Sequence, residues 1–219
     1  MNKNLRSNRF LLTQLLLSCL IFTQFCAYAA PFSLEYQGFY QRLKKVNKGH
    51  FQLVEVAFLV PNKDKCRILS GNIATENNTY PLAYSDAQQL YIPYDPKLKS
   101  NRALINMDIE GESKDCSLMM QVRVKTPKLS YDAAEVQQIQ TEMDTLLSDM
   151  QGFPMRYFSD PISGLNVEFN EPTQVSIDGI EVYVGQKYHL GHKEVEQFSR
   201  IYFSHKPKLI SPWIEANVQ

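Results

Sequence analysis

Two cysteines constrain the fold of this chain more than any other feature of its sequence. Cys66 and Cys116 are the cysteines that remain once an N-terminal targeting segment, which contains Cys19 and Cys26, is removed. Outside the cytosol such a pair is expected to form a disulfide. That bond would close a loop of about 51 residues and stabilise the fold by roughly 4 kcal/mol in the loop-entropy model. A free-thiol nucleophile is the alternative, but neither cysteine lies in a recognisable cysteine-enzyme motif.

The N-terminus has the pattern of a Sec-type signal peptide. Lys3, Arg6 and Arg9 precede an apolar run over residues 10–22, and a small-x-small site follows at Ala27-Tyr28-Ala29. This order of basic, apolar and small residues is typical of export signals. We expect cleavage after Ala29 and a periplasmic or secreted protein. A transmembrane helix needs about 20 apolar residues, so we expect no stable membrane span after signal cleavage.

Two other interpretations of this segment are open. Leu16-Leu17-Ser18-Cys19 loosely imitates a lipoprotein cleavage box, in which Cys19 would be lipidated. The apolar run continues past Cys19 through Leu20, Ile21 and Phe22, which favours the later cut. An uncleaved signal acting as an anchor is the second alternative.

Composition excludes some partners. The chain is 44% apolar and 21% charged, which is typical of a globular protein. Without its first 29 residues it has 20 basic and 23 acidic residues, so no global attraction to nucleic acid is expected. We expect residues 30–219 to form a single α+β domain. The alternative is a subdivision into a β-rich part, 30–126, and a part with a helix and a β hairpin, 127–219.

The region between the cysteines predicts a β structure. Strands are expected at 51–60, 66–73, 88–94, 103–110 and 116–124. In the last of them Cys116 shares one face with the apolar residues Leu118, Met120, Val122 and Val124. A cysteine on the core face can join two packed strands, as in immunoglobulin-like architectures. We therefore predict a disulfide-linked, antiparallel β-sandwich-like part.

Two helices are predicted by a period of 3.6 residues. The first helix spans 33–48. The face opposite its apolar residues carries Arg42, Lys44, Lys45 and Lys48. We interpret this basic face as solvated rather than as a site for anionic lipid or lipopolysaccharide. The second spans 130–151 with Ser130 as its cap. Its apolar stripe contains Val136, Ile139, Met143, Leu146, Leu147 and Met150. We expect this stripe to pack on the sheet rather than in a dimeric coiled coil.

The last third of the chain returns to strands. Asp178-Gly179 is a strong signal for a two-residue hairpin turn. The expected register pairs Ile177 with Ile180, Val175 with Val182 and Thr173 with Val184, so that the apolar partners share one face. Further strands are expected at 198–204 and 209–214.

The candidates for chemistry are few. The sequence His189-Leu190-Gly191-His192, joined by Glu194 or His205, could bind a metal, and zinc bound in this way could activate water. Exposed loop histidines explain the same pattern, so we expect no metal and no other cofactor. The polar loop with Tyr157, Asp160 and Ser163 lacks a partnered base and is interpreted as a turn, and Trp213 is expected to fix the C-terminal tail.

Four tyrosines form the other candidate site. Tyr80, Tyr84, Tyr91 and Tyr94 lie within one loop-and-edge region of the sequence, where their rings could stack on a sugar or a peptide. Packing in the core and at the sheet edge is the simpler interpretation.

Several short segments resemble a known family. They are Gly38-Phe39-Tyr40, Cys66 and Cys116 with Gly71 and Ile73, Pro93-Tyr94-Asp95-Pro96 with Leu98, Gln151-Gly152-Phe153-Pro154, and Pro212-Trp213. Together they resemble an uncharacterised family of exported proteins from Gram-negative bacteria, known as a domain of unknown function. The resemblance implies a periplasmic setting and supplies no activity, cofactor or site residue.

The function expected from the sequence is therefore binding rather than catalysis. We predict a non-enzymatic periplasmic protein that binds an envelope protein or glycan through a sheet edge or the tyrosine-rich region. The alternative is a periplasmic hydrolase, metal-assisted through His189 and His192.

Overall fold

The computed structural model describes residues 29–112, 116–152 and 160–215. The segment 1–28, which makes up nearly all of the expected signal peptide, and the residues Phe153, Pro154 and Tyr157 lie outside the described residues.

The N-terminal half of the chain forms two antiparallel sheets of four strands each. The first sheet has the order β1 (Ala29–Glu35), β7 (Leu104–Glu110), β3 (Arg67–Ala74) and β4 (Thr79–Pro81). The second sheet has the order β5 (Ala83–Tyr84), β6 (Gln89–Tyr91), β2 (Val54–Leu59) and β8 (Met119–Val124). Helix α2 (Tyr36–Gly49) and the short α3 (Pro96–Ser100) complete this half.

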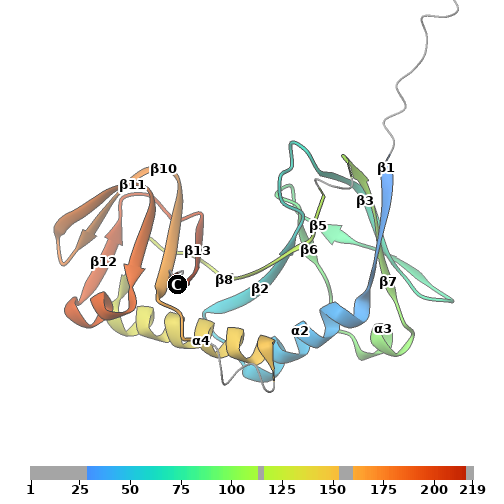
Figure 1. Cartoon of the computed structure of the whole chain (residues 1–219), viewed down its shortest axis with the longest axis horizontal. Coiled ribbons are helices and arrows are strands. Elements are labelled where there is room, and N and C mark those ends of the chain that lie inside the picture. Colours follow the sequence, from blue (N-terminus) through green and yellow to red (C-terminus); the bar gives the residue numbers. More distant parts are fainter. Residues whose placement is uncertain (1–28, 113–115, 153–159, 216–219) are drawn as a thin grey trace, which may run out of the picture.

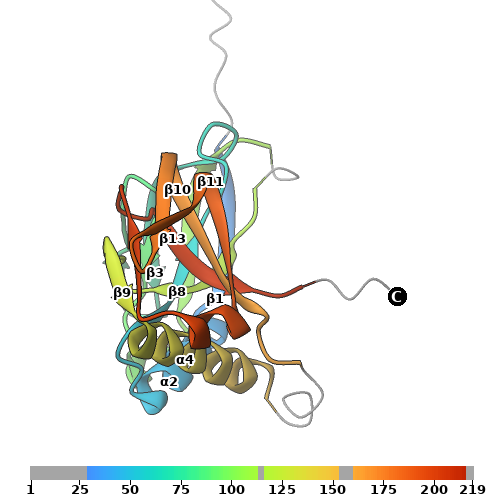
Figure 2. The same ribbon diagram turned by 90° about the vertical axis from the view of Figure 1, so that its left-hand side faces the viewer.

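The C-terminal half forms a third sheet. Its strands are β11 (Ile180–Gly191), β10 (Gly164–Ile177), β12 (Arg200–Phe203) and β9 (Ser130–Asp132), and β13 (Leu209–Trp213) pairs with the first part of β10. Helix α4 (Ala133–Gln151) and the 3₁₀ helix η2 (His192–Gln197) belong to the same half. In Figure 1 the two groups of strands stand at opposite ends, with β2 and β8 running between them and α4 and α2 along one side. Figure 2 shows both helices on the same side of the strands.

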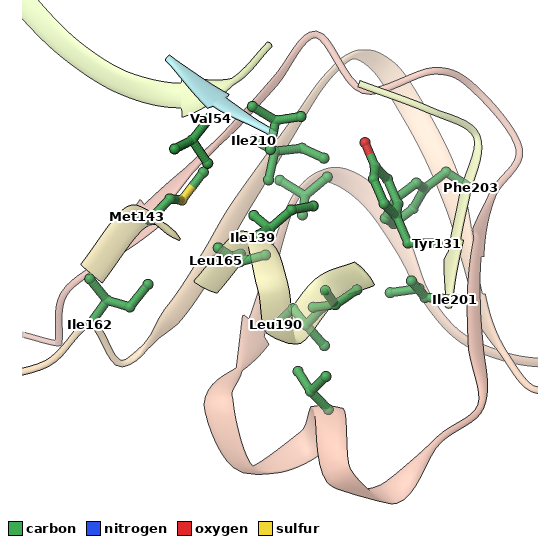
Figure 3. Close-up of a cluster of buried hydrophobic side chains, with 14 of the residues drawn as sticks. Val54, Tyr131, Ile139, Met143, Ile162, Leu165, Leu190, Ile201, Phe203 and Ile210 are labelled. Atoms are coloured by element: carbon green, nitrogen blue, oxygen red, sulfur yellow. The ribbon is translucent and has the colours of Figure 1, made fainter. Parts of the chain in front are cut away.

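Two hydrophobic clusters hold this arrangement together. The C-terminal cluster is formed by α4 and the third sheet, and Figure 3 shows Ile139 and Met143 of α4 close to Val54, Leu165 and Ile210. The N-terminal cluster lies between α2 and the first two sheets. Its largest fully buried side chains are Tyr36, Ile105 and Met107. Strand β2 contributes to both, because Val54 belongs to the C-terminal cluster and Phe58 to the N-terminal one.

The α+β fold and the disulfide predicted from the sequence are confirmed. Cys66 and Cys116 are bonded, with their Cα atoms 5.4 Å apart. Their position differs in one respect, because Cys116 precedes β8 and Cys66 precedes β3. The bond therefore joins the ends of the first and second sheets, and its Cys66 end is fully buried in the N-terminal cluster.

Helix α4 packs as expected, but it begins later. Val136, Ile139, Met143 and Leu146 are at most 2% exposed and lie in the C-terminal cluster, so the stripe packs within the chain. Ser130 does not cap the helix, because it lies in β9, where it pairs with Tyr202 of β12. The cap is Asp132, whose side chain accepts a hydrogen bond from the N–H of Glu135 at 2.8 Å.

The first helix is also shorter than its pattern suggested. Residues 33–35 are part of β1, where Leu34 pairs with Ile105 of β7. Phe32 and Leu34 are half-buried while Ser33 and Glu35 are exposed, which is the alternation of a strand. Helix α2 therefore starts at Tyr36.

The predicted hairpin register is right at the turn and wrong beyond it. Ile177 pairs with Ile180, but a bulge then pairs Val175 with Tyr183 instead of Val182. Val175 is fully buried, while Val182 is 48% exposed. The bulge directs the larger Tyr183 ring toward the C-terminal cluster, where it also lies 5.4 Å from the Tyr188 ring. Thr173 consequently pairs with Gly185 rather than Val184.

None of the helices in the described part of the chain combines the length and the apolar composition that are needed to cross a membrane.

A buried glutamine fixes the end of the sandwich near the disulfide. Gln88 is 2% exposed, and its amide donates hydrogen bonds to the carbonyl oxygens of Val60 and Cys66 at 2.9 and 2.7 Å. Its side-chain oxygen accepts one from the N–H of Ile68 at 2.7 Å. One side chain thus links the end of β2, the disulfide and the start of β3. Gln140 of α4 is equally buried, yet neither atom of its amide has a partner among the described residues.

We expect leucine to have opposite effects at these two glutamines. Gln88→Leu leaves three buried backbone groups unpaired and should lower the free energy of unfolding by about 3 kcal/mol. Gln140→Leu removes two unpaired polar atoms and should raise it by about 1 kcal/mol. Urea denaturation of both variants tests this. Destabilisation by Gln140→Leu would contradict the assignment of Gln140 as unpaired.

Glu142 anchors the start of β2 to α4. Its carboxylate accepts hydrogen bonds from the N–H groups of Leu53 and Val54 at 2.8 and 3.2 Å, and from the Gln138 amide at 2.9 Å. Burial by itself would raise the pKa of Glu142. The hydrogen bonds, that of Leu53 first, outweigh this effect and lower the pKa below 4.5.

This lowered pKa predicts how the stability depends on pH. The Glu142 carboxylate should stabilise the folded protein above about pH 4.5, and the stabilisation should be lost as the pH falls through the lowered pKa. Glu142→Gln should therefore reduce the melting temperature at neutral pH, and the difference from the wild type should shrink in acid. The exposed Glu181→Gln is the control and should change the melting temperature little at either pH. The prediction is wrong if Glu142→Gln lowers the melting temperature by the same amount at every pH.

Candidate functional site

The two histidines of the H-x-x-H pattern line one cleft in the C-terminal half. This cleft of about 690 Å³ lies where β10 begins and where β11 and β13 end. Gly164 marks the meeting point, because it pairs with both Gly191 and Trp213. The other residues of its lining that the sequence singled out are Asp160, Ser163, Glu194 and Trp213.

The polar groups of this cleft bind the local backbone. The Glu194 carboxylate accepts a hydrogen bond from the N–H of Gly191 at 3.1 Å, and the Ser163 hydroxyl accepts one from the N–H of Glu215 at 2.9 Å. The His189 ring lies 5.0 Å from the Trp213 ring, at an angle of 50°. These contacts order the strand ends.

The described residues do not supply a metal site here. No group of three or more His, Cys, Asp or Glu side chains within 29–112, 116–152 and 160–215 is placed to hold a metal ion. His205 is absent from the lining of the cleft and lies 3.8 Å from the Glu171 carboxylate instead. Among the described residues of the cleft, none is placed with His189 and His192 as the third protein ligand that metal-assisted hydrolysis would require.

The four tyrosines do not form one stacking surface. Tyr84 is opposite Leu90 in the β5–β6 ladder and Tyr91 is opposite Ala83, so the two rings point to opposite faces of the second sheet. Tyr80 belongs to the first sheet.

Tyr94 lies beyond the end of β6, which is shorter than the expected strand at 88–94. Its ring stacks on Tyr40 of α2, with centroids 4.9 Å apart. The two hydroxyls are 3.3 Å apart, and this hydrogen bond raises the pKa of Tyr94. Tyr94 is thus part of the packing of α2.

The feature that the sequence did not reveal is an open side of the sandwich. On one side the chain passes directly from β4 to β5 through the buried Leu82, so the two sheets are joined there. On the other side each sheet ends in an edge strand. Within the described residues, β1 pairs with β7 alone and β8 with β2 alone. A slot of about 250 Å³ lies between these two edges.

The walls of this slot are apolar. They are formed by side chains from both sheets and from α2, namely Leu34, Phe39, Phe58, Leu118 and Met120. The Phe39 and Phe58 rings meet edge to face, with centroids 4.9 Å apart, and form the inner end. Met120 is 37% exposed, so the slot is open to solvent beside β8. The charged residues in the lining are Glu35 and Arg42.

Gly38 lines the slot from α2. It lies inside α2, where glycine costs about 1 kcal/mol relative to alanine. A Cβ atom at this position would come no closer than 3.7 Å to Arg42 Nη1, which is an ordinary contact. Steric conflict therefore does not require glycine here. A larger side chain at this position of the lining is expected to occupy space in the slot.

Comparison with known proteins gives one result. The family model described as "Protein of unknown function (DUF2987)" matches residues 28–169. The chain belongs to this family. The DUF2987 match confirms the resemblance seen in the sequence. No curated protein and no solved structure matches the chain.

The extent of the DUF2987 match separates the two candidate sites. Residues 28–169 include every residue in the lining of the slot, from Leu34 to Met120. In the C-terminal cleft, Asp160 and Ser163 lie inside the matched range, whereas His189, His192 and Trp213 lie outside it. The slot is therefore the candidate site that lies wholly within the family region.

Proposed function

We propose that this DUF2987 protein is exported to the periplasm and binds an apolar part of an envelope component in the slot between β1 and β8, without catalysing a reaction. The observation that carries the proposal is the apolar slot between two unpaired strand edges, with Gly38 in its lining. Pockets that bind small molecules are concave and mostly apolar, with a few polar groups placed to orient the ligand. The slot has this composition, with Arg42 and Glu35 as its charged groups.

The setting supports binding to an envelope component. The N-terminal pattern is that of an export signal, and the Cys66–Cys116 bond is typical of proteins from oxidising compartments. Lipids and lipid-linked molecules, which have apolar parts, are abundant in the envelope. A protein that holds such a part in a slot would shield it from water.

The export proposal makes a direct prediction. The protein should be released by osmotic shock, and its N-terminal sequence should begin at Ala30-Pro31. Residues 30–219 would then form the mature domain, and cleavage would remove only the first residue of β1. An N-terminus at a lipid-modified Cys19, or retention in the membrane fraction, would contradict it.

Binding in the slot is tested with a neutral apolar fluorophore, N-phenyl-1-naphthylamine, on the mature protein. We expect saturable binding to the wild type and at least a tenfold loss in Gly38→Leu, because the leucine side chain fills the slot. Leucine is a better helix former than glycine, so this variant should remain folded.

Gln41→Leu is the matched control. It places the same side chain on an exposed position of α2 that does not line the slot, and it should bind the probe like the wild type. The proposal is wrong if the wild type shows no saturable binding, or if Gly38→Leu binds the probe as tightly as Gln41→Leu does.

A further inference from the structure

Arg42 stands at the mouth of the slot with most of its hydrogen-bonding capacity free. Its Nη1 donates to the carbonyl oxygen of Gly38 at 2.9 Å, which holds the guanidinium beside this glycine of the slot lining. The side chain is exposed and forms no ion pair with any residue of the described segments. A guanidinium has five N–H donors, so four remain for a ligand.

The other charges near the mouth favour an anion. Glu35 lines the slot and also a neighbouring pocket that contains Lys99 and Arg102. Neither of these cations is in an ion pair within the part of the chain that the structure describes. Lys99 lies over the Tyr40 ring, 5.4 Å from its centroid. Among the described residues that line the two pockets, three are therefore cations and one is a carboxylate.

The shape and chemistry of the slot restrict the rest of the ligand. Its volume of about 250 Å³ is just below the range of about 300–1,000 Å³ for pockets that hold drug-sized molecules. A small apolar group, such as one hydrocarbon chain, fits this volume. The five apolar side chains of the walls offer it no hydrogen bond, so the group should have no polar atoms of its own.

We propose that the slot binds an amphiphile with one hydrocarbon chain and an anionic head group, the chain lying between β1 and β8 and the head group pairing with Arg42. This inference rests on the proposed function, because it names the ligand class of the same site. Guanidinium groups pair with carboxylates and phosphates through two parallel hydrogen bonds, which gives them a preference for such head groups.

Displacement of bound N-phenyl-1-naphthylamine from the mature protein tests the ligand class. Dodecanoate and 1-dodecanol are added below their aggregation limits, because they share a chain and differ in the charge of the head group. Dodecanoate should displace the probe at about tenfold lower concentration than dodecanol, as expected for one charge-assisted pair. Added salt should reduce this advantage.

Two variants identify Arg42 as the source of the preference. Arg42→Gln should lose the advantage of dodecanoate and keep the affinity for dodecanol and for the probe. Lys48→Gln removes the same charge from an exposed position of α2 that does not line the slot, and it should keep the preference of the wild type.

The outcomes separate this inference from the proposed function. If the probe binds but the two amphiphiles displace it equally, or if Lys48→Gln loses the preference as Arg42→Gln does, the anionic head group is wrong and binding in the slot stands. If the probe binds and neither amphiphile displaces it, the slot does not take a hydrocarbon chain. A slot that takes only an extended apolar peptide from a partner protein would give this last result. If the probe itself does not bind, the proposed function fails.

Discussion

The ladder between β2 and β8 is the connection on which the rest of the structure depends. It runs from Val54 paired with Val124 at one end to Leu59 paired with Met119 at the other. Its first end belongs to the C-terminal cluster, and Phe58 near its second end belongs to the N-terminal cluster. Because adjacent strands share backbone hydrogen bonds, this ladder places the two clusters at a set distance along one pair of strands.

Both ends of the ladder are held by contacts from elsewhere in the chain. Near β3 the Cys66–Cys116 bond and the Gln88 side chain tie the second sheet to the first. Near the helices, the Glu142 carboxylate binds the backbone at the start of β2. Lys45 of α2 donates hydrogen bonds to the last carbonyls of α4, where a positive charge is favourable and α4 has no basic residue of its own. Helix contacts and sheet contacts thus support the same geometry.

The open slot is a consequence of this geometry. Strand β8 stays paired with β2 along its whole length, and the pair runs toward the C-terminal half, where β8 lies close to β13. It therefore cannot follow β1 along its length and close the sandwich. An unpaired edge normally has to be protected or used, since its free backbone groups can bind another chain. Here the space between the edges is filled only partly by Phe39, and Gly38 lines the slot that remains, which is why we place the binding site there.

Several features of this protein are determined by its sequence alone. Local spacing or a count of residues is enough to predict the cysteine pair, the α4 stripe with Val136 and Met143, and the two-residue turn at Asp178. The structure confirms all three. The family resemblance is of the same kind, because it depends on residues and their order. Such features need no knowledge of what packs against them.

Tertiary structure decides the rest, because it depends on partners distant in the sequence. Gln88 and Gln140 are the same residue and equally buried, yet one is fully hydrogen-bonded and the other has no described partner. The hairpin register changes where burial of Tyr183 outweighs that of Val182. The slot exists because β1 and β8, which belong to different sheets, each have an unpaired edge among the described residues. A local sequence pattern does not predict which strand edges remain unpaired in the fold.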